Sequence, residues 1–196
     1  MNERPISFND EMISAILAGE KQQTRRPLKP QPEGGAHRDF GRWCNGNNAR
    51  LICKHGAVGD RLWVREAHSI RVTPWALSNG LAWYRRSDIG DMWAGEIRWQ
   101  PQQRMPRWAS RILLEITSIR IERLHDISQE DAKAEGFKKP LKTPDIKYAL
   151  DDYLVDERTS FAECWDGIYS TWSENPWVWV IGFKVLSTQP QWEAKA

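Results

Sequence analysis

The chain has 196 residues, with 28 Lys plus Arg against 26 Asp plus Glu and a formal net charge of +2. This length fits a single domain, residues 1–196, with a sizeable core. The near-neutral total argues against a protein that holds nucleic acid through many sequence-independent phosphate contacts. No stretch approaches the roughly 18 apolar residues of a membrane helix, and we expect no membrane association.

Three cysteines are present, Cys44, Cys53 and Cys164. An odd number without a Cys-x-x-Cys spacing argues against a disulfide framework and favours a reducing compartment. The N-terminus is polar and carries no apolar signal core. We therefore expect a cytoplasmic protein, and the sequence indicates no obligate protein partner.

The first predicted element is a short helix that begins at Asn9 or Asp10, since both residues are good N-caps. Its apolar positions fall on one face. A glycine in the left-handed conformation is a common helix terminator, and we expect Gly19 to end this helix. The apolar face consists of Met12, Ile13, Ile16 and Leu17.

Residues 27–58 are predicted to be mostly loop, because three prolines and two glycines interrupt their first part. This segment also contains two thiols and two imidazoles within nineteen positions, a composition that could hold zinc. The spacing fits no common zinc finger, so unliganded loop residues are the alternative, and we predict no metal and no cofactor. The four residues are His37, Cys44, Cys53 and His55.

Strands follow in the middle of the chain. Residues 61–66 are predicted as a strand after the Gly-Asp turn at 59–60, and residues 81–85 and 96–99 are shorter candidates. Residues 109–124 give the clearest alternation of apolar and polar positions. The alternation changes phase near residues 117–118, which predicts a β-bulge or a bend.

Two more helices and a last strand complete the pattern. Ser128 is predicted to start a helix that ends at Gly136, and residues 160–172 carry an apolar stripe at helical spacing. Residues 177–183 are predicted as a strand after Asn-Pro. Strands outnumber helices without regular alternation, so we predict an α+β fold on a mixed or antiparallel, barrel-like sheet.

Basic residues concentrate in two segments. Residues 20–29 contain four basic side chains and one acidic, and residues 96–111 have the same balance. Most of the 12 tryptophans are expected in the core, but Trp99 and Trp108 lie in Pro- and Arg-containing stretches where a ring could stack on a base.

These elements occur in a recognisable order. The motif ILAGEKQQTRR at residues 16–26, the turn GDRL at 59–62, the segment ISQEDAKAEGF at 127–137 and the strand WVIGFK at 179–184 together resemble the ASCH-domain family. The resemblance implies a PUA-like mixed β-barrel with flanking helices. The stretches MPRWAS and NPWVW are similar to those of long ASCH proteins from phages and prophages. Relative to compact members, residues 27–58, 68–107 and 138–160 are insertions.

The resemblance also implies a chemistry. A small bacterial member removes the acetyl group of N(4)-acetylcytidine with a lysine, a threonine and a glutamate, which match Lys21, Thr24 and Glu135 here. Thr24 is then the nucleophile and Lys21 the general base. For Glu135, orientation of the lysine, proton delivery to the leaving amine and activation of the deacylating water all stay open.

The predicted partner is an acylated nucleoside or modified nucleotide, with single-stranded RNA as the alternative. We expect substrate contacts from Arg25, Arg26, Trp108 and Arg111. Two other functions compete with the amidohydrolase: an RNA- or DNA-binding PUA-like module without turnover, and a nuclease acting on single-stranded RNA. Taken without the resemblance, a lysine after a helix end is ordinarily a solvated partner of the helix dipole, and Thr-Arg-Arg an ordinary edge strand.

Overall fold

The computed structural model describes residues 2–70, 82–83, 99–138 and 156–189. Its strands are β1 (Glu3–Ser7), β2 (Gln23–Pro27), β3 (Ala36–Asp39), β4 (Arg42–Asn45), β5 (Arg61–Arg65), β6 (Ser69–Ile70), β7 (Ala82–Trp83), β8 (Leu113–Arg123) and β9 (Trp177–Ser187). Its α-helices are α1 (Asp10–Leu17), α4 (Gln129–Ala134) and α5 (Glu157–Tyr169). Short 3-10 turns include η2 (Gln102–Arg104), η3 (Arg107–Ala109), η4 (Leu124–Asp126) and η6 (Trp172–Glu174).

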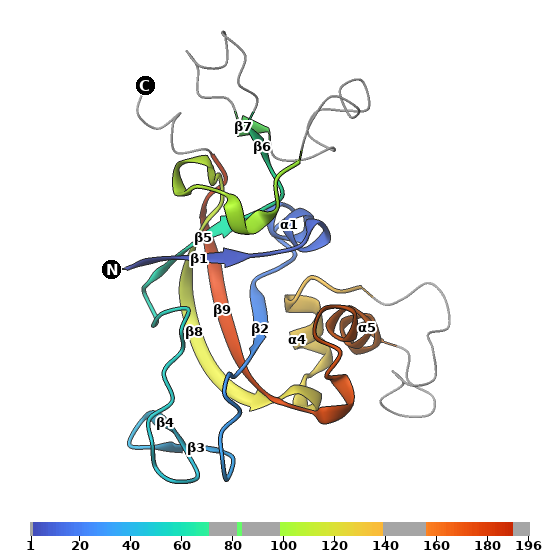
Figure 1. Cartoon of the computed structure of the whole chain (residues 1–196). Coiled ribbons are helices and arrows are strands. Elements are labelled where there is room, and N and C mark those ends of the chain that lie inside the picture. The colour runs from blue at the N-terminus through green and yellow to red at the C-terminus, as the bar shows by residue number, and fades with distance from the viewer. Residues whose placement is uncertain (1, 71–81, 84–98, 139–155, 190–196) are drawn as a thin grey trace.

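The main sheet has five strands in the order β1-β5-β8-β9-β2 (Figure 1). Only the β1–β5 pair is parallel, so the sheet is mixed and the predicted α+β class is confirmed. The barrel-like sheet is open, because no ladder among the described strands joins β1 to β2. Both edge strands are short and contain a proline, Pro5 or Pro27, which has no N–H to offer a closing ladder.

The two central strands are long and curved. The β8–β9 register shifts between Ile116 and Ser118, which confirms the bulge predicted from the phase change. Bulges increase local bend and twist, so β8 and β9 wrap around the core instead of lying flat (Figure 1).

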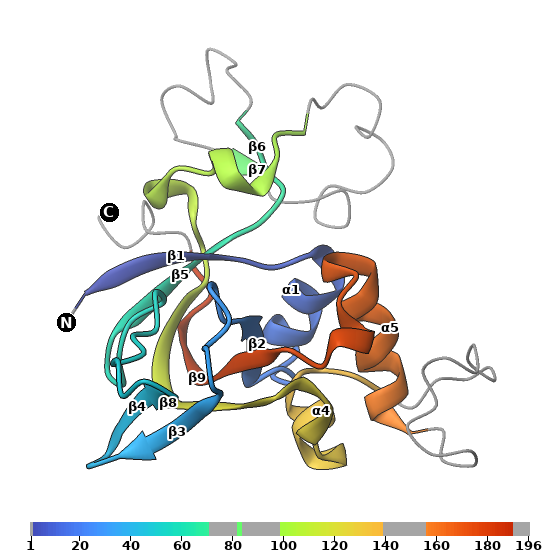
Figure 2. The ribbon, with the colours of Figure 1, turned by 60° about the horizontal axis from the view of Figure 1, so that its bottom comes forward.

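Strand β9 separates two hydrophobic cores. Trp179, Ile181 and Phe183 face the core beneath α1, whereas Val178 and Val180 face the core formed with α4 and α5. A strand buried on both faces needs apolar residues at consecutive positions, which explains the unbroken run from residue 177 to 181. Figure 2 shows α1 and α5 beside β2.

The predicted helix ends are confirmed for α1 and α4. Asn9 Oδ1 accepts from the Met12 amide at 2.9 Å, and Ser128 Oγ accepts from the Asp131 amide at 3.1 Å. Gly19 and Gly136 have φ of +74° and +88° just past the two helices. The third helix begins earlier than predicted, at Glu157, because Asp156 caps it through the Arg158 amide.

Residues 27–58 are not simply loop. They include a two-stranded hairpin, β3–β4, whose strands join at Phe40 and Gly41 with φ of 42° and 78°. Two consecutive residues of positive φ make the turn that matches the twist of paired strands. The prolines that led to the loop prediction lie before the hairpin and leave its strands intact.

Parts of the predictions lie outside the described residues. These are most of the strand candidates at 81–85 and 96–99 and much of the insertions at 68–107 and 138–160. Within the described ranges, no helix combines the length and the apolar character that crossing a membrane requires.

Candidate functional site

The site lies where the chain leaves α1 and enters the edge strand β2. Lys21 forms an isolated antiparallel bridge with Glu135, the residue that follows α4. Lys21 Nζ donates to Glu135 Oε2 at 2.7 Å and to the Glu135 carbonyl oxygen at 2.8 Å. The Lys21 side chain has 0% exposure. The structure thus brings together two residues that are 114 positions apart.

Strand alternation separates the next three side chains. Thr24 and Arg26 lie opposite Ile181 and Trp179, which face the α1 core, while Arg25 lies opposite Val180, which faces α4 and α5. Directly opposite residues of an antiparallel pair share a face. Thr24 and Arg26 therefore share one face of β2, and Arg25 takes the other.

Burial dominates the protonation of Lys21. Loss of solvent lowers the pKa of this amine, and although the nearby Glu135 carboxylate raises it, the pKa stays below its ordinary value. The charge of Arg26 lowers the Lys21 pKa further. A lysine with a lowered pKa can act as a base near neutral pH. Both of its hydrogen bonds go to Glu135, however, and neither goes to the Thr24 hydroxyl.

Arg25 is bound by three carboxylates. Its guanidinium pairs with Glu122, with Asp131 at 2.7 Å and with Glu135 at 3.3 Å, and its side chain is fully buried. Partial burial acts to raise the pKa of Asp131, but hydrogen bonds and charge from Arg25 and Arg120 hold it below its ordinary value. Arg25 thus holds Glu135 from the side opposite Lys21.

Arg26 has no carboxylate partner among the described residues. Its guanidinium donates to the Ser7 carbonyl at 2.7 Å and to the Tyr169 hydroxyl at 3.2 Å. The guanidinium carbon also lies 5.1 Å from the centre of the Phe8 ring, and Lys21 Nζ lies 5.7 Å from the same centre. Phe8 is therefore an apolar wall against which both cations stand.

Three adjoining cavities surround these side chains. We call the central one, lined by Thr24, Arg26 and Glu135, the inner cavity; it has a volume of about 10 Å³, room for about one water molecule. The side cavity, about 280 Å³, shares Glu135 and Cys164 with it. The outer cavity, about 420 Å³, shares Arg26 and Tyr169 with it. Thr24 thus lies between two larger spaces.

The other two predicted substrate contacts lie elsewhere. Trp108 is 45% exposed on η3, next to Arg107, which pairs with Glu3 at 2.8 Å. Arg111 binds the buried Glu66 through two hydrogen bonds, at 3.1 and 2.9 Å. Neither Trp108 nor Arg111 lines the inner, side or outer cavity. Of the predicted contacts, the structure gathers only Arg25 and Arg26 around Lys21.

The four residues considered for zinc are dispersed. His37 lies opposite Cys44 in the hairpin and bonds Asn48 at 3.1 Å, whereas Cys53 is in the α1 core and His55 lines the outer cavity. Within the described ranges, no group of three or more His, Cys, Asp or Glu residues could hold a metal ion.

Several residues of the site were not anticipated from the sequence. Glu122 and Asp131 bind Arg25, Tyr169 bonds Arg26, and Cys164 lines both the inner and the side cavity. Asp131 sits at a helix start and Tyr169 on an apolar stripe, where such residues are ordinary. Their role depends on the packing of α4 and α5 against β2, which short-range patterns do not encode.

No protein-family model matches the chain, and no curated protein matches it. Two solved structures resemble it weakly. Protein EF3133 of Enterococcus faecalis V583, from the family DUF984, has a TM-score of 0.43 and 11% identity over 95% of this chain and 82% of its own. An ASCH domain from Lactobacillus crispatus JV V101 has a TM-score of 0.41 and 15% identity over 95% and 80%. At these scores neither likeness bears on the function of this chain.

Proposed function

We propose that the chain is an amidohydrolase that removes the acyl group of N(4)-acetylcytidine or a related acylated nucleoside. The observation that carries the proposal is the fully buried Lys21 amine, which lies 2.7 Å from the carboxylate of Glu135. Glu135 and Thr24 both line the inner cavity. The resemblance of the motifs around these three residues to the ASCH family supports the same assignment. An acyl transfer needs a nucleophile, a base and a proton donor, and these side chains can supply them.

The first step prepares the base. Lys21 transfers one proton to Glu135 across their hydrogen bond, which leaves a neutral amine and a carboxylic acid. Burial lowers the pKa of Lys21 and so favours this exchange. The neutral amine then takes the Thr24 hydroxyl proton while Thr24 Oγ1 bonds to the acetyl carbon.

The second step releases cytidine. The tetrahedral intermediate collapses, the carbon–nitrogen bond breaks, and Glu135 gives its proton to the departing amine nitrogen. Lys21 is then an ammonium and Glu135 a carboxylate, as at the start, and Thr24 carries the acetyl group. A repeat of the exchange lets Lys21 deprotonate a water, whose oxygen bonds to the acetyl carbon. The bond between that carbon and Thr24 Oγ1 then breaks, Glu135 returns its proton to Thr24 Oγ1, and acetic acid leaves and ionises in water.

The remaining requirement is a donor for the oxyanion. Arg26 is suited to this role, because it lines the inner cavity and its guanidinium has no carboxylate partner among the described residues. A pyrimidine does not fit about 10 Å³. Binding therefore has to displace the Tyr169 and Ile168 side chains, which line both the inner and the outer cavity.

The test uses chromatography to measure the release of cytidine from N(4)-acetylcytidine. We expect turnover by the wild type and losses of at least 100-fold, about 2.7 kcal/mol, in Thr24→Val, Lys21→Met and Glu135→Gln. These substitutions remove the reacting groups at nearly constant side-chain volume.

Thr159→Val is the matched control. Thr159 is 1% exposed like Thr24 but lies in α5 and lines none of the three cavities. This variant should keep wild-type turnover. Full activity in Thr24→Val would exclude a covalent route through this hydroxyl, and no turnover in the wild type would refute the proposal.

A nucleic-acid-binding module without turnover is the second candidate, and the basic residues of the outer cavity favour it. It predicts salt-sensitive binding of single-stranded RNA and no release of cytidine. The two functions are separated by the same chromatographic assay run beside a binding titration.

A further inference from the structure

The lining of the outer cavity carries only one sign of charge. Four cationic side chains line it, and none of the described residues that line it is Asp or Glu. The cations come from three separate parts of the chain: β2 and the residues after it, the segment before β5, and β5 itself. They are Arg26, Lys29, Lys54 and Arg65.

The two guanidinium groups are fixed by the same residue. Arg26 donates to the Ser7 carbonyl at 2.7 Å, and Arg65 Nε donates to the Ser7 hydroxyl at 3.1 Å. These neutral acceptors orient the guanidinium groups without neutralising them. Uncompensated positive charge in a concave site attracts anions, because the surrounding protein is of low dielectric.

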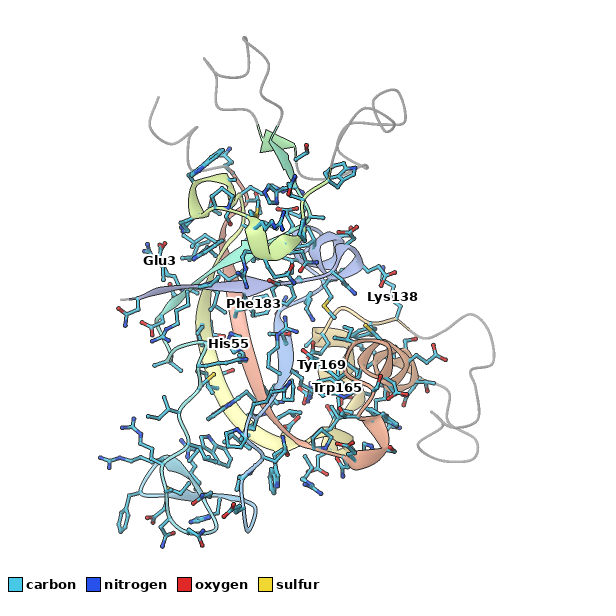
Figure 3. The ribbon with its side chains drawn as sticks, viewed as in Figure 1. Glu3, His55, Lys138, Trp165, Tyr169 and Phe183 are labelled. Carbon is cyan, nitrogen blue, oxygen red and sulfur yellow. The ribbon has the colours of Figure 1, made fainter. Side chains whose placement is uncertain are left out.

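His55 also lines this cavity. Its Nε2 is buried and has no hydrogen-bond partner among the described residues. Burial, followed by the charges of Arg26, Lys54 and Arg4, lowers the pKa of His55 to about 4, so the ring is neutral at pH 7. Figure 3 shows His55 and Tyr169 to either side of β2, and both residues line the outer cavity.

The outer cavity adjoins the proposed reaction centre. Arg26, Met12, Ile168 and Tyr169 line both the outer and the inner cavity. A ligand whose acyl group reaches Thr24 can therefore extend past Arg26 and Tyr169 into the outer cavity.

We propose that the outer cavity binds the phosphate group of the substrate, so that the preferred substrate is an acylated cytidine mononucleotide and not the free nucleoside. The identity of the base in this inference rests on the proposed function. The phosphate site is inferred only from the residues that line the cavity. Arg65 and the two lysines supply charged donors of the kind that phosphate oxygens accept.

A single phosphate fits these observations better than a long strand. A volume of about 420 Å³ falls within the usual range for small-molecule sites. The net charge of the chain is only +2, which is little for a protein that follows a polyanionic backbone.

The direct test compares binding of cytidine 5′-monophosphate and cytidine to the full chain by calorimetry. We expect the monophosphate to bind at least about tenfold more tightly, and the advantage to shrink in high salt. Lys29→Gln and Lys54→Gln should each weaken monophosphate binding about threefold, and about tenfold together. Neither should change the affinity for cytidine.

Lys133→Gln is the matched control. Lys133 is exposed on α4, pairs with Glu157 at 3.8 Å and lines none of the three cavities, so its loss should leave both affinities unchanged. Equal binding of cytidine and its monophosphate by the wild type would overturn the phosphate site. So would an oligonucleotide that binds more than about tenfold better than the monophosphate, because it would require several phosphate contacts.

A second readout is the protonation of His55. The negative charge of a phosphate bound in the outer cavity should raise the pKa of His55 from about 4, a change that NMR titration detects with and without cytidine 5′-monophosphate. An unchanged His55 titration at saturating monophosphate would place the phosphate elsewhere.

The outcomes separate this inference from the proposed function. If the monophosphate is preferred but neither N(4)-acetylcytidine nor its monophosphate is hydrolysed, the amidohydrolase fails and the phosphate site stands. If both are hydrolysed with the same KM, the phosphate site fails and the amidohydrolase stands.

Discussion

Lys21 is the residue on which the chemistry depends, and its surroundings act on it in opposite directions. Burial and the charge of Arg26 lower the pKa of Lys21, while Glu135 raises it. The 2.7 Å contact with Glu135 keeps the amine in place and offers a carboxylate that can take its proton. A solvated lysine would hold its proton at neutral pH.

Substitutions of the two charged neighbours should move the pKa of Lys21 in opposite directions. In Glu135→Gln the carboxylate charge is lost, so the Lys21 pKa should fall further below its ordinary value. In Arg26→Gln a repelling charge is lost, so the pKa should rise. NMR titration of the Lys21 side chain, labelled at its terminal carbon, measures both, and shifts of the same sign would contradict this electrostatic account.

For single residues, the sequence indicated which side chains lie near each other. It did not indicate which acidic and basic groups form ion pairs. The resemblance grouped Lys21 with Glu135, and the structure places them together. The resemblance did not indicate that Arg25 lies on the opposite face of β2 and pairs with Glu122 and Asp131. That outcome follows from the register of β2 on β9, which depends on long-range pairing.

The junction between α1 and α4 is the element that positions the site. Gly136 follows Glu135 with φ of +88°, and a Cβ there would lie 2.9 Å from Ala15 Cβ and 3.2 Å from Lys21 Cβ. Only a glycine allows the two chain segments to approach so closely in this conformation. The close approach lets the Lys21–Glu135 bridge form.

Two alanine substitutions test this junction. Gly19→Ala introduces a side chain at φ of +74° with no atom within 4 Å, so it should lower the free energy of unfolding by about 1 kcal/mol from backbone strain alone. Gly136→Ala adds steric overlap to the same strain and should cost about 3 kcal/mol. Urea denaturation measures both, and equal costs would show that the close approach is unimportant.

At the element scale, local signals were sufficient for the helix ends and insufficient for the sheet edges. Asn9, Ser128 and the glycines that follow α1 and α4 act as short-range chemistry predicts. Whether β1 and β2 pair with each other is decided by the whole sheet, and they remain open edges. The β3–β4 hairpin was missed because Phe40 and Gly41 are not a typical turn pair.

At the level of the whole molecule, the described residues pack into two hydrophobic cores that meet at β9. The Arg25 ion pairs connect β2 and β8 to α4 on one side of this boundary, and the Lys21–Glu135 pair connects α4 to the end of α1 on the other. Removing one partner of a buried ion pair leaves an uncompensated charge. The same network therefore supports both stability and the geometry of the site.

The network should give the protein a characteristic response to acid. The pKa of Asp131 is lowered in the folded state, so its contribution is complete above the pKa of the unfolded chain and is lost as the pH falls below about 4. Asp131→Asn should cost about 2 kcal/mol at pH 7, and the difference from the wild type should shrink in acid. Urea denaturation at pH 7 and pH 3 measures this difference.

Asp126→Asn is the control for that comparison. Asp126 is exposed on η4, close in sequence to Asp131, and its substitution should change the free energy of unfolding by no more than about 0.5 kcal/mol at either pH. A difference for Asp131→Asn that stays constant from pH 7 to pH 3 would contradict the assigned ion pairs.

In the proposed mechanism, Thr24 carries the acyl group during turnover. The most direct measurement is mass spectrometry of peptides from the protein quenched within milliseconds of mixing with N(4)-acetylcytidine. We expect an acetyl group on Thr24 in the wild type and none in Thr24→Val, which should also fail to release cytidine. Cytidine release at the wild-type rate by Thr24→Val, with no acetylated peptide at any quench time, would contradict this mechanism.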